Sequence, residues 1–319
     1  MITKEPSQHV TPLSDEQAGF PAQISLDGLT PPPTPQSQSY AWLEVIKGFV
    51  VWVLSVAMLA FVPVIVALPY IIYQWRTVGS PRPDAILTDK TLIFLSILGI
   101  LPAHVLTIAL VWLFVTEGGK KPFWDGLAFR WPRYSSPLVA TLLCVLLALA
   151  LLAIGLAITT LWGGSKTQLD ALVESSMAAR IATALVAVLT APLAEELIYR
   201  GVLYSSLERA TNRAISIVIV SLLFAGVHVL QYMQNIGVIL VITLLSFTLT
   251  LSRAYTGSLI PPFIIHLVFN GIQAIVIVLT PYIEKNFLQK GEQITPTTPG
   301  LELGSRLFET ISVYLCRMT

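Results

Sequence analysis

The sequence predicts an all-α polytopic membrane protein, a helical bundle of about seven transmembrane helices around an intramembrane polar cavity. The composition supports this class, because 55% of the 319 residues are hydrophobic and only 12% are charged, against about 25% charged in an ordinary soluble domain. The mean hydropathy is +0.75. Ionisable side chains nevertheless interrupt the later apolar stretches, and hydrocarbon tolerates such groups only when they are paired or face a polar cavity.

Apolar stretches of roughly 20 residues, the length that crosses about 30 Å of hydrocarbon, recur along the chain. They lie near 49–73, 91–115, 138–162, 181–207, 214–233, 236–254 and 258–281. The last three are joined by very short links at Gln234–Asn235 and Tyr255–Gly257. We therefore expect these three helices to pack as sequential neighbours.

The spans divide the chain into four segments. Residues 1–40 are polar and rich in proline, without the apolar region of a signal peptide, so we expect a disordered tail that stays on the protein. The N-terminal transmembrane helices occupy 41–165, and a helical core that carries the polar cluster occupies 166–282. Residues 283–319 return to polar character, and their apolar residues recur at near-helical spacing, which favours an amphipathic helix at the membrane surface.

Charge and cysteine content exclude several functions. The formal net charge of +1 gives no basic surplus for nucleic-acid binding. The two cysteines, Cys144 and Cys316, have a spacing that fits neither a metal site nor a disulfide framework. Lysine and arginine are divided almost equally between the two sides of the predicted membrane, so the positive-inside rule does not determine the orientation.

Two adjacent glutamates, Glu195 and Glu196, and an arginine, Arg200, interrupt the apolar stretch at 181–207. Residues four apart share a helix face, so Glu196 can pair with Arg200 while Glu195 projects elsewhere as a candidate general base. The alternative is that all three form one buried salt-bridge network that only ties helices together. Pro192 removes a backbone donor and is expected to kink the helix just before Glu195.

Histidines lie in two of the later spans. His228 follows Phe224 by four residues and His266 precedes Asn270 by four, so the members of each pair share a helix face. Imidazole and carboxamide groups can donate hydrogen bonds to a developing oxyanion. A single histidine in an apolar segment is more often a packed core residue, and we assign His104 to packing. The other two cluster with the glutamates and the arginine, which favours a common site.

These residues resemble the motif set of the CPBP family, also called the ABI or type II CAAX prenyl protease family of intramembrane endopeptidases. Three motifs carry the resemblance, over about residues 180–282. They are E-E-x-x-x-R at Glu195, Glu196 and Arg200, F-x-x-x-H at Phe224 and His228, and H-x-x-x-N at His266 and Asn270.

The resemblance implies an intramembrane endopeptidase of CAAX-processing type, a peptide hydrolase often classed as a metalloendopeptidase. Glu195 and His228 would activate a water that attacks a peptide carbonyl, and His266 and Asn270 would stabilise the tetrahedral oxyanion. The supporting residues would be Glu196, Arg200 and Phe224. The implied partners are the lipid bilayer and a membrane-associated protein or lipidated peptide as substrate, and the cavity would open to the cytosol.

The metal requirement is a separate question. If the site used zinc, its ligands would be Glu195, His228 and His266, a set that leaves one coordination position open. However, the sequence contains no H-E-x-x-H motif, and the same three side chains already have roles in hydrolysis by a glutamate-activated water. We therefore expect no cofactor.

Two other functions remain open. In the first, the protein is a non-catalytic membrane scaffold or a bacteriocin self-immunity protein, and the polar cluster is structural. In the second, it is a proton-coupled transporter with Glu195 as a relay, although the sequence shows no internal repeat or pair of broken helices. The polar N-terminus and the absence of an arginine-rich transit segment favour a bacterial plasma membrane.

Overall fold

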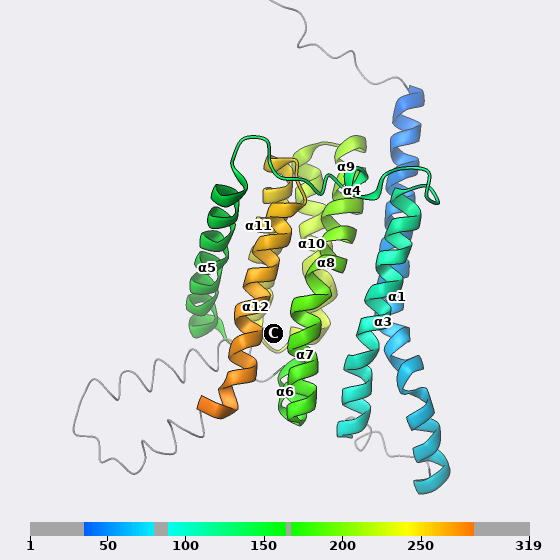
Figure 1. Ribbon diagram of the computed structural model, residues 1–319, viewed down its shortest axis with the longest axis vertical. Helices are drawn as coiled ribbons and strands as arrows, with labels where there is room; N and C mark the ends of the chain where they lie inside the picture. Colours follow the sequence, from blue (N-terminus) through cyan, green and yellow to red (C-terminus); the bar gives the residue numbers. More distant parts are fainter. Residues whose placement is uncertain (1–34, 80–88, 164–166, 284–319) are drawn as a thin grey trace, which may run out of the picture.

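The computed structural model describes residues 35–79, 89–163 and 167–283. Within these ranges all regular secondary structure is helical (Figure 1). Seven helical stretches in the described part of the chain are long and apolar enough to cross a membrane, as many as the sequence predicts. These stretches are Ser39–Val78, Lys90–Val115, Pro137–Trp162, Met177–Ala210, Arg213–Tyr232, Ile236–Thr256 and Ile260–Ile283.

The first helix, α1 (Pro35–Val78), has 44 residues and begins earlier than expected. Residues 35–40, expected from the sequence to belong to the polar tail, are therefore helical. The rest of that tail lies outside the described residues, as does the amphipathic helix expected within 283–319. α1 packs along α3 (Lys90–Val115), where a side chain on Gly99 would come within 2.5 Å of the Cα of Pro63. Only glycine permits this approach of the two backbones.

Polar caps define where several helices begin. The side chain of Asp89 accepts hydrogen bonds from two backbone N–H groups at the start of α3, and Ser136 caps α5 (Pro137–Trp162). Asn212 and Asn235 cap α10 (Arg213–Tyr232) and α11 (Ile236–Thr256) in the same way. These side chains satisfy backbone donors that have no partner inside the helix, so each of these helices begins at a capping residue.

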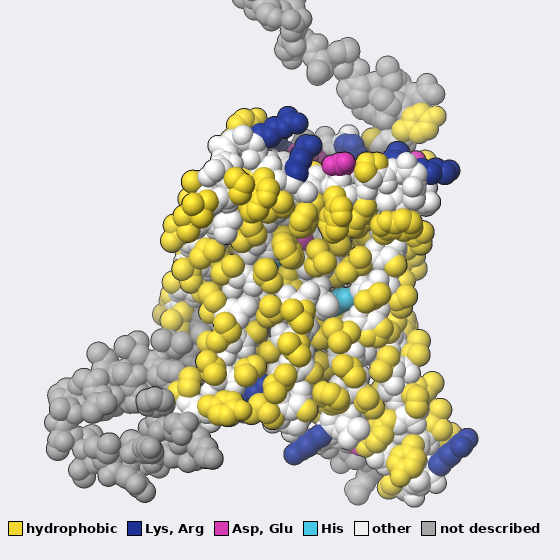
Figure 2. All heavy atoms as spheres, viewed as in Figure 1, with side chains coloured by type: hydrophobic (Ala, Val, Ile, Leu, Met, Phe, Trp, Pro, Cys, Tyr) yellow, Lys and Arg dark blue, Asp and Glu magenta, His cyan; other side chains and the backbone are white. Residues whose placement is uncertain are grey.

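The C-terminal helices form the larger packed body. α10 packs on α11 and α11 packs on α12 (Ile260–Ile283), as the short links between these helices predict, and α5 packs on both α11 and α12. Cys144 of α5 is buried in the apolar cluster between these helices, as a packing role requires. Figure 2 shows hydrophobic side chains over the middle of the molecule and lysine and arginine near its two ends, the distribution typical of a membrane-spanning bundle.

The fourth span is not one continuous α-helix. It consists of α7 (Met177–Leu189), α8 (Ala191–Glu196), a π-helix η2 (Leu197–Leu203) and α9 (Tyr204–Ala210). The break falls at Thr190, whose φ of −123° and ψ of −39° lie outside the α-helix values, next to Pro192 in the first turn of α8. The expected interruption near Pro192 is confirmed. The π-helix was not predicted, and such segments often mark functional sites.

Candidate active site

A buried ion pair joins Glu196, the last residue of α8, to Arg200 in η2. Nη1 of Arg200 donates to Oε1 of Glu196 at 2.9 Å, and the exposed fractions of the two side chains are 0% and 1%. The pairing expected from the four-residue spacing is therefore confirmed. Removing only one partner of such a pair strongly destabilises a protein, because the other charge is left buried without compensation.

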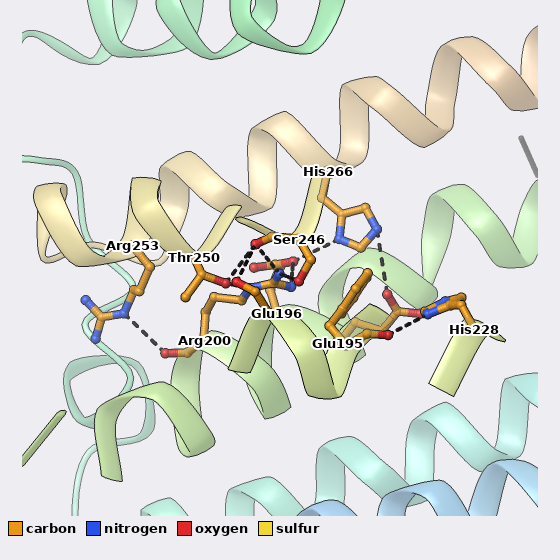
Figure 3. A network of polar contacts seen from close by, with 10 residues as sticks. Glu195, Glu196, Arg200, His228, Ser246, Thr250, Arg253 and His266 are labelled. Atoms are coloured by element: carbon orange, nitrogen blue, oxygen red, sulfur yellow. Dashed lines mark hydrogen bonds and ion pairs between the residues drawn. The ribbon is translucent and has the colours of Figure 1, made fainter. Parts of the chain in front are cut away.

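The guanidinium of Arg200 also fixes the neighbouring helix α11 (Figure 3). Its Nε donates to Oγ1 of Thr250 at 3.3 Å. Its Nη2 donates to the carbonyl oxygen and to Oγ of Ser246, both at 3.0 Å. Arginine provides five donors in a fixed planar arrangement, and here they connect η2 to α11 in a region without solvent. The π-helix is thus held at a defined position directly after the glutamates.

Glu195 has a different environment from its neighbour. Its side chain is 20% exposed and it lines a cavity inside the bundle. Its Oε2 lies 3.7 Å from Nε2 of His266. The two adjacent carboxylates are therefore separated as the spacing predicts, one buried against Arg200 and the other facing the cavity.

His266 of α12 lies between the two glutamates. Its Nδ1 is 2.9 Å from Oε1 of Glu196, and its Nε2 faces Glu195. A carboxylate can only accept a hydrogen bond, so the contact with Glu196 places a proton on Nδ1. Nε2 then carries a lone pair in the neutral ring and a proton only in the imidazolium. The neutral and the charged forms of the ring therefore differ in the proton at Nε2, the nitrogen that faces Glu195.

His228 of α10 is oriented by its own helix. Its Nδ1 lies 2.8 Å from the backbone carbonyl oxygen of Phe224, which can only accept, so Nδ1 carries the proton and Nε2 of the neutral ring is an acceptor. His228 and Glu195 line the same cavity and lie at the same end of the polar network in Figure 3. The F-x-x-x-H spacing thereby produces an imidazole with a defined basic nitrogen.

The ring of Phe224 is the common packing partner of the site. Its centroid lies 4.9 Å from that of His228, 5.9 Å from that of His266 and 5.0 Å from that of Tyr199. The guanidinium carbon of Arg200 lies 4.6 Å from the same centroid, a distance suited to a cation–π contact. Phe224 therefore supports the polar groups without contributing one itself.

Asn270 lies one turn after His266 and lines the cavity. Its Nδ2 donates to the carbonyl oxygen of Ala187 at 3.1 Å, which ties α12 to α7. One of its two amide protons is therefore already engaged. The second proton is the one that a ligand could use.

The cavity has a volume of about 440 Å³ and lies between the α1–α3 pair and the C-terminal helices. Besides the motif residues, apolar side chains form most of its wall, including Leu59, Ile100 and Val227. The lining continues to Gln231 and Tyr232 at the end of α10. Such a cavity can accept an apolar ligand next to a small number of oriented polar groups.

Three cavity residues were not recognised as functional candidates from the sequence. His104 of α3 lines the cavity, with Nδ1 2.8 Å from Oγ1 of Thr190 at the break between α7 and α8. Tyr199 also lines it, and Nε1 of Trp52 donates to the Tyr199 hydroxyl oxygen at 3.1 Å. The available signal for Tyr199 was its position four residues after Glu195. His104 and Trp52 lie in the first two spans, which carry no motif.

The three residues named as possible zinc ligands, Glu195, His228 and His266, all line the cavity. Among the described residues, no group of three or more histidine, cysteine, aspartate or glutamate side chains is placed to hold an ion. Nδ1 of His266 is directed at Glu196 and Nδ1 of His228 at a backbone carbonyl, so each ring has only Nε2 left for another contact. Cys316 lies outside the described residues.

The fold and the site define a polytopic helical membrane protein with a glutamate–histidine cavity inside the bundle. Residues 177–272 match the family described as Type II CAAX prenyl endopeptidase Rce1-like. The matched segment contains all three motifs, so the resemblance stated from the sequence is confirmed, and at family level it supports a CAAX-type intramembrane protease. Comparisons with curated proteins and with solved structures gave no significant match.

Proposed function

We propose that this protein is an intramembrane endopeptidase of CAAX-processing type that uses a water molecule activated by Glu195 and His228. The observation that supports this most directly is the separation of the two glutamates. Arg200 engages Glu196, whereas Glu195 lines the cavity together with His228 and its acceptor nitrogen Nε2. A carboxylate and a neutral imidazole that share a cavity can together bind and deprotonate a water.

In the proposed reaction, the water lies between the carboxylate of Glu195 and Nε2 of His228. One of these groups takes a proton as the water oxygen attacks the scissile carbonyl carbon, and the carbonyl π electrons move to oxygen to give a tetrahedral oxyanion. Collapse of this intermediate breaks the C–N bond, and the transferred proton goes to the leaving amine. One water is consumed, and a carboxyl and an amino terminus are formed.

The oxyanion requires donors that point at it before the reaction begins. Asn270 offers its second amide proton, because the first is directed at Ala187. His266 offers a donor at Nε2 only as an imidazolium, since its Nδ1 proton is directed at Glu196. Glu196 and Glu195 lie on either side of this ring, with Oε1 of Glu196 2.9 Å from Nδ1 and Oε2 of Glu195 3.7 Å from Nε2. In this proposal, Glu196 therefore has two roles. It pairs with Arg200, and it orients the ring of His266 by accepting the Nδ1 proton.

The proposed chemistry needs no metal ion, and all of its proton transfers are carried out by these side chains. The proposed substrate is a membrane-associated protein or a lipidated peptide, whose apolar part the largely apolar cavity wall suits. We further propose a bacterial plasma membrane as the location, with the cavity accessible from the cytosol. A non-catalytic scaffold is less well supported, because Glu195 is outside the hydrogen-bonded network of Arg200.

The test is cleavage of a farnesylated peptide with a CAAX sequence by the purified protein in proteoliposomes, with products identified by mass spectrometry. Wild type should release a C-terminal fragment, and Glu195→Gln should lower the rate at least about 100-fold, since general-base catalysis contributes roughly 10²–10⁴. Glu117→Gln, a matched change at an exposed carboxylate in the loop after α3, should cleave as wild type does. Equal rates for wild type and Glu195→Gln would refute the proposed role of Glu195.

A further inference from the structure

Tyr199 lies on the same side of the fourth span as Glu195. The two residues are four apart, as are Glu196 and Arg200, so each pair shares a helix face. The second pair is buried, and the first pair lines the cavity. The phenol of Tyr199 is therefore a polar group of the cavity, and it has no role among the residues proposed above to carry out the hydrolysis.

The hydrogen bonds of this phenol leave its proton available. The indole N–H of Trp52 is a donor only, and it donates to the Tyr199 hydroxyl oxygen at 3.1 Å. The phenol must therefore act as acceptor in that contact. Among residues 35–79, 89–163 and 167–283, the Tyr199 hydroxyl donates no hydrogen bond, and the contact with Trp52 is its one hydrogen bond. A buried O–H group normally donates a hydrogen bond, so this one is available to donate to a group that enters the cavity.

The orientation of the ring is fixed on several sides. Phe224 contacts the Tyr199 ring edge-on, with centroids 5.0 Å apart and an interplanar angle of 74°. The guanidinium carbon of Arg200 lies 5.9 Å from the Tyr199 centroid. Trp52, which fixes the hydroxyl, is itself packed edge-on against Phe49 at 6.2 Å. A donor held in this way needs little reorganisation when charge develops beside it.

We infer that Tyr199 is a further catalytic residue, which donates its phenolic hydrogen bond to the oxygen of the scissile carbonyl as that oxygen becomes the oxyanion. Trp52 is its positioning residue. The inference rests on the proposed function, and it gives the oxyanion a neutral donor beside Asn270 and His266. Both of those side chains already direct a proton at a protein acceptor, whereas Tyr199 directs none.

The test compares Tyr199→Phe with Tyr204→Phe in the farnesylated-peptide assay. Tyr204 lies five residues further along the same span, is equally buried and donates to Glu208 at 2.7 Å, but it does not line the cavity. Tyr199→Phe should lower kcat roughly 10- to 100-fold with KM nearly unchanged, because the lost hydrogen bond strengthens only in the transition state. Tyr204→Phe should keep the wild-type kcat, although it loses a hydrogen bond of its own.

A double-mutant comparison distinguishes catalysis from packing. Trp52→Phe should lower kcat less than Tyr199→Phe does, and adding it to Tyr199→Phe should lower kcat no further, since both changes act through one phenol. If wild type cleaves and Tyr199→Phe retains the wild-type kcat, the inference is wrong while the proposed function stands. If the kcat losses multiply, or if Tyr204→Phe loses as much, the role is structural and the inference is also wrong. If wild type does not cleave, both fail together.

Discussion

Replacing Arg200 with lysine separates the charge of this residue from its hydrogen-bonding geometry. Lysine keeps the positive charge and can still pair with Glu196, but a single ammonium group cannot also reach Thr250 and both oxygens of Ser246. The substitution therefore removes three hydrogen bonds, with lengths of 3.3, 3.0 and 3.0 Å. The connection between η2 and α11 should weaken accordingly.

The expected loss of unfolding free energy follows from these three bonds. Interhelical hydrogen bonds in membrane proteins average about 0.6 kcal/mol each, which gives a lower value of about 2 kcal/mol. At about 1.5 kcal/mol each, the upper end of the usual range for a hydrogen bond in a protein, the loss would be about 4.5 kcal/mol. Arg200→Lys should therefore destabilise the protein by about 2 to 4.5 kcal/mol.

The assay is unfolding of the detergent-solubilised protein, followed by tryptophan fluorescence, with Arg213→Lys as the matched control. Arg213 has 56% of its side chain exposed and lies 3.5 Å from Glu208, so its replacement should change the unfolding free energy by less than about 0.5 kcal/mol. If Arg200→Lys destabilised the protein no more than Arg213→Lys does, the structural role given to the guanidinium would be refuted.

Three further predictions concern the site and one helix start. His228→Gln should lower the cleavage rate at least about 100-fold. It should leave the melting temperature nearly unchanged, because the hydrogen bond of His228 to Phe224 lies within one helix. A large fall in melting temperature together with the loss of cleavage would indicate a packing role instead. Dialysis against a chelator should leave cleavage intact, and loss of activity that zinc restores would contradict the metal-free proposal. Burial raises the pKa of Asp89, but hydrogen bonds from Leu92, Tyr70 and Thr91 outweigh it and hold this pKa below its usual range. The stabilisation by Asp89 should therefore be present at neutral pH and be lost as the pH falls below about 4, so the difference in melting temperature between wild type and Asp89→Asn should shrink there.

The sequence predicted the features that depend on local spacing. Seven spans follow from apolar runs of sufficient length, and the pairing of Glu196 with Arg200 follows from helical periodicity. The break near Pro192 follows from the missing backbone donor.

The sequence did not predict features that depend on contacts between distant spans. The first two spans show only hydrophobicity, so nothing local indicated that Trp52 and His104 would reach the cavity. The π-helix was also missed, because the residues of η2 have no pattern that distinguishes a π-turn from an α-turn. Packing by Phe224 and hydrogen bonds from Arg200 to α11 accompany it, and both involve residues more than 20 positions away in the chain.

The central claim is that two adjacent glutamates have different functions, and a paired measurement of Glu195→Gln and Glu196→Gln tests it most directly. Cleavage rate and unfolding free energy are measured for both variants under the same conditions. Glu195→Gln should abolish cleavage and change the unfolding free energy by less than about 1 kcal/mol, since its contact at 3.7 Å is partly exposed. Glu196→Gln should lower the unfolding free energy by about 3 to 5 kcal/mol, because it leaves the buried Arg200 without its counter-charge. Equal effects of the two variants on both quantities would contradict the claim.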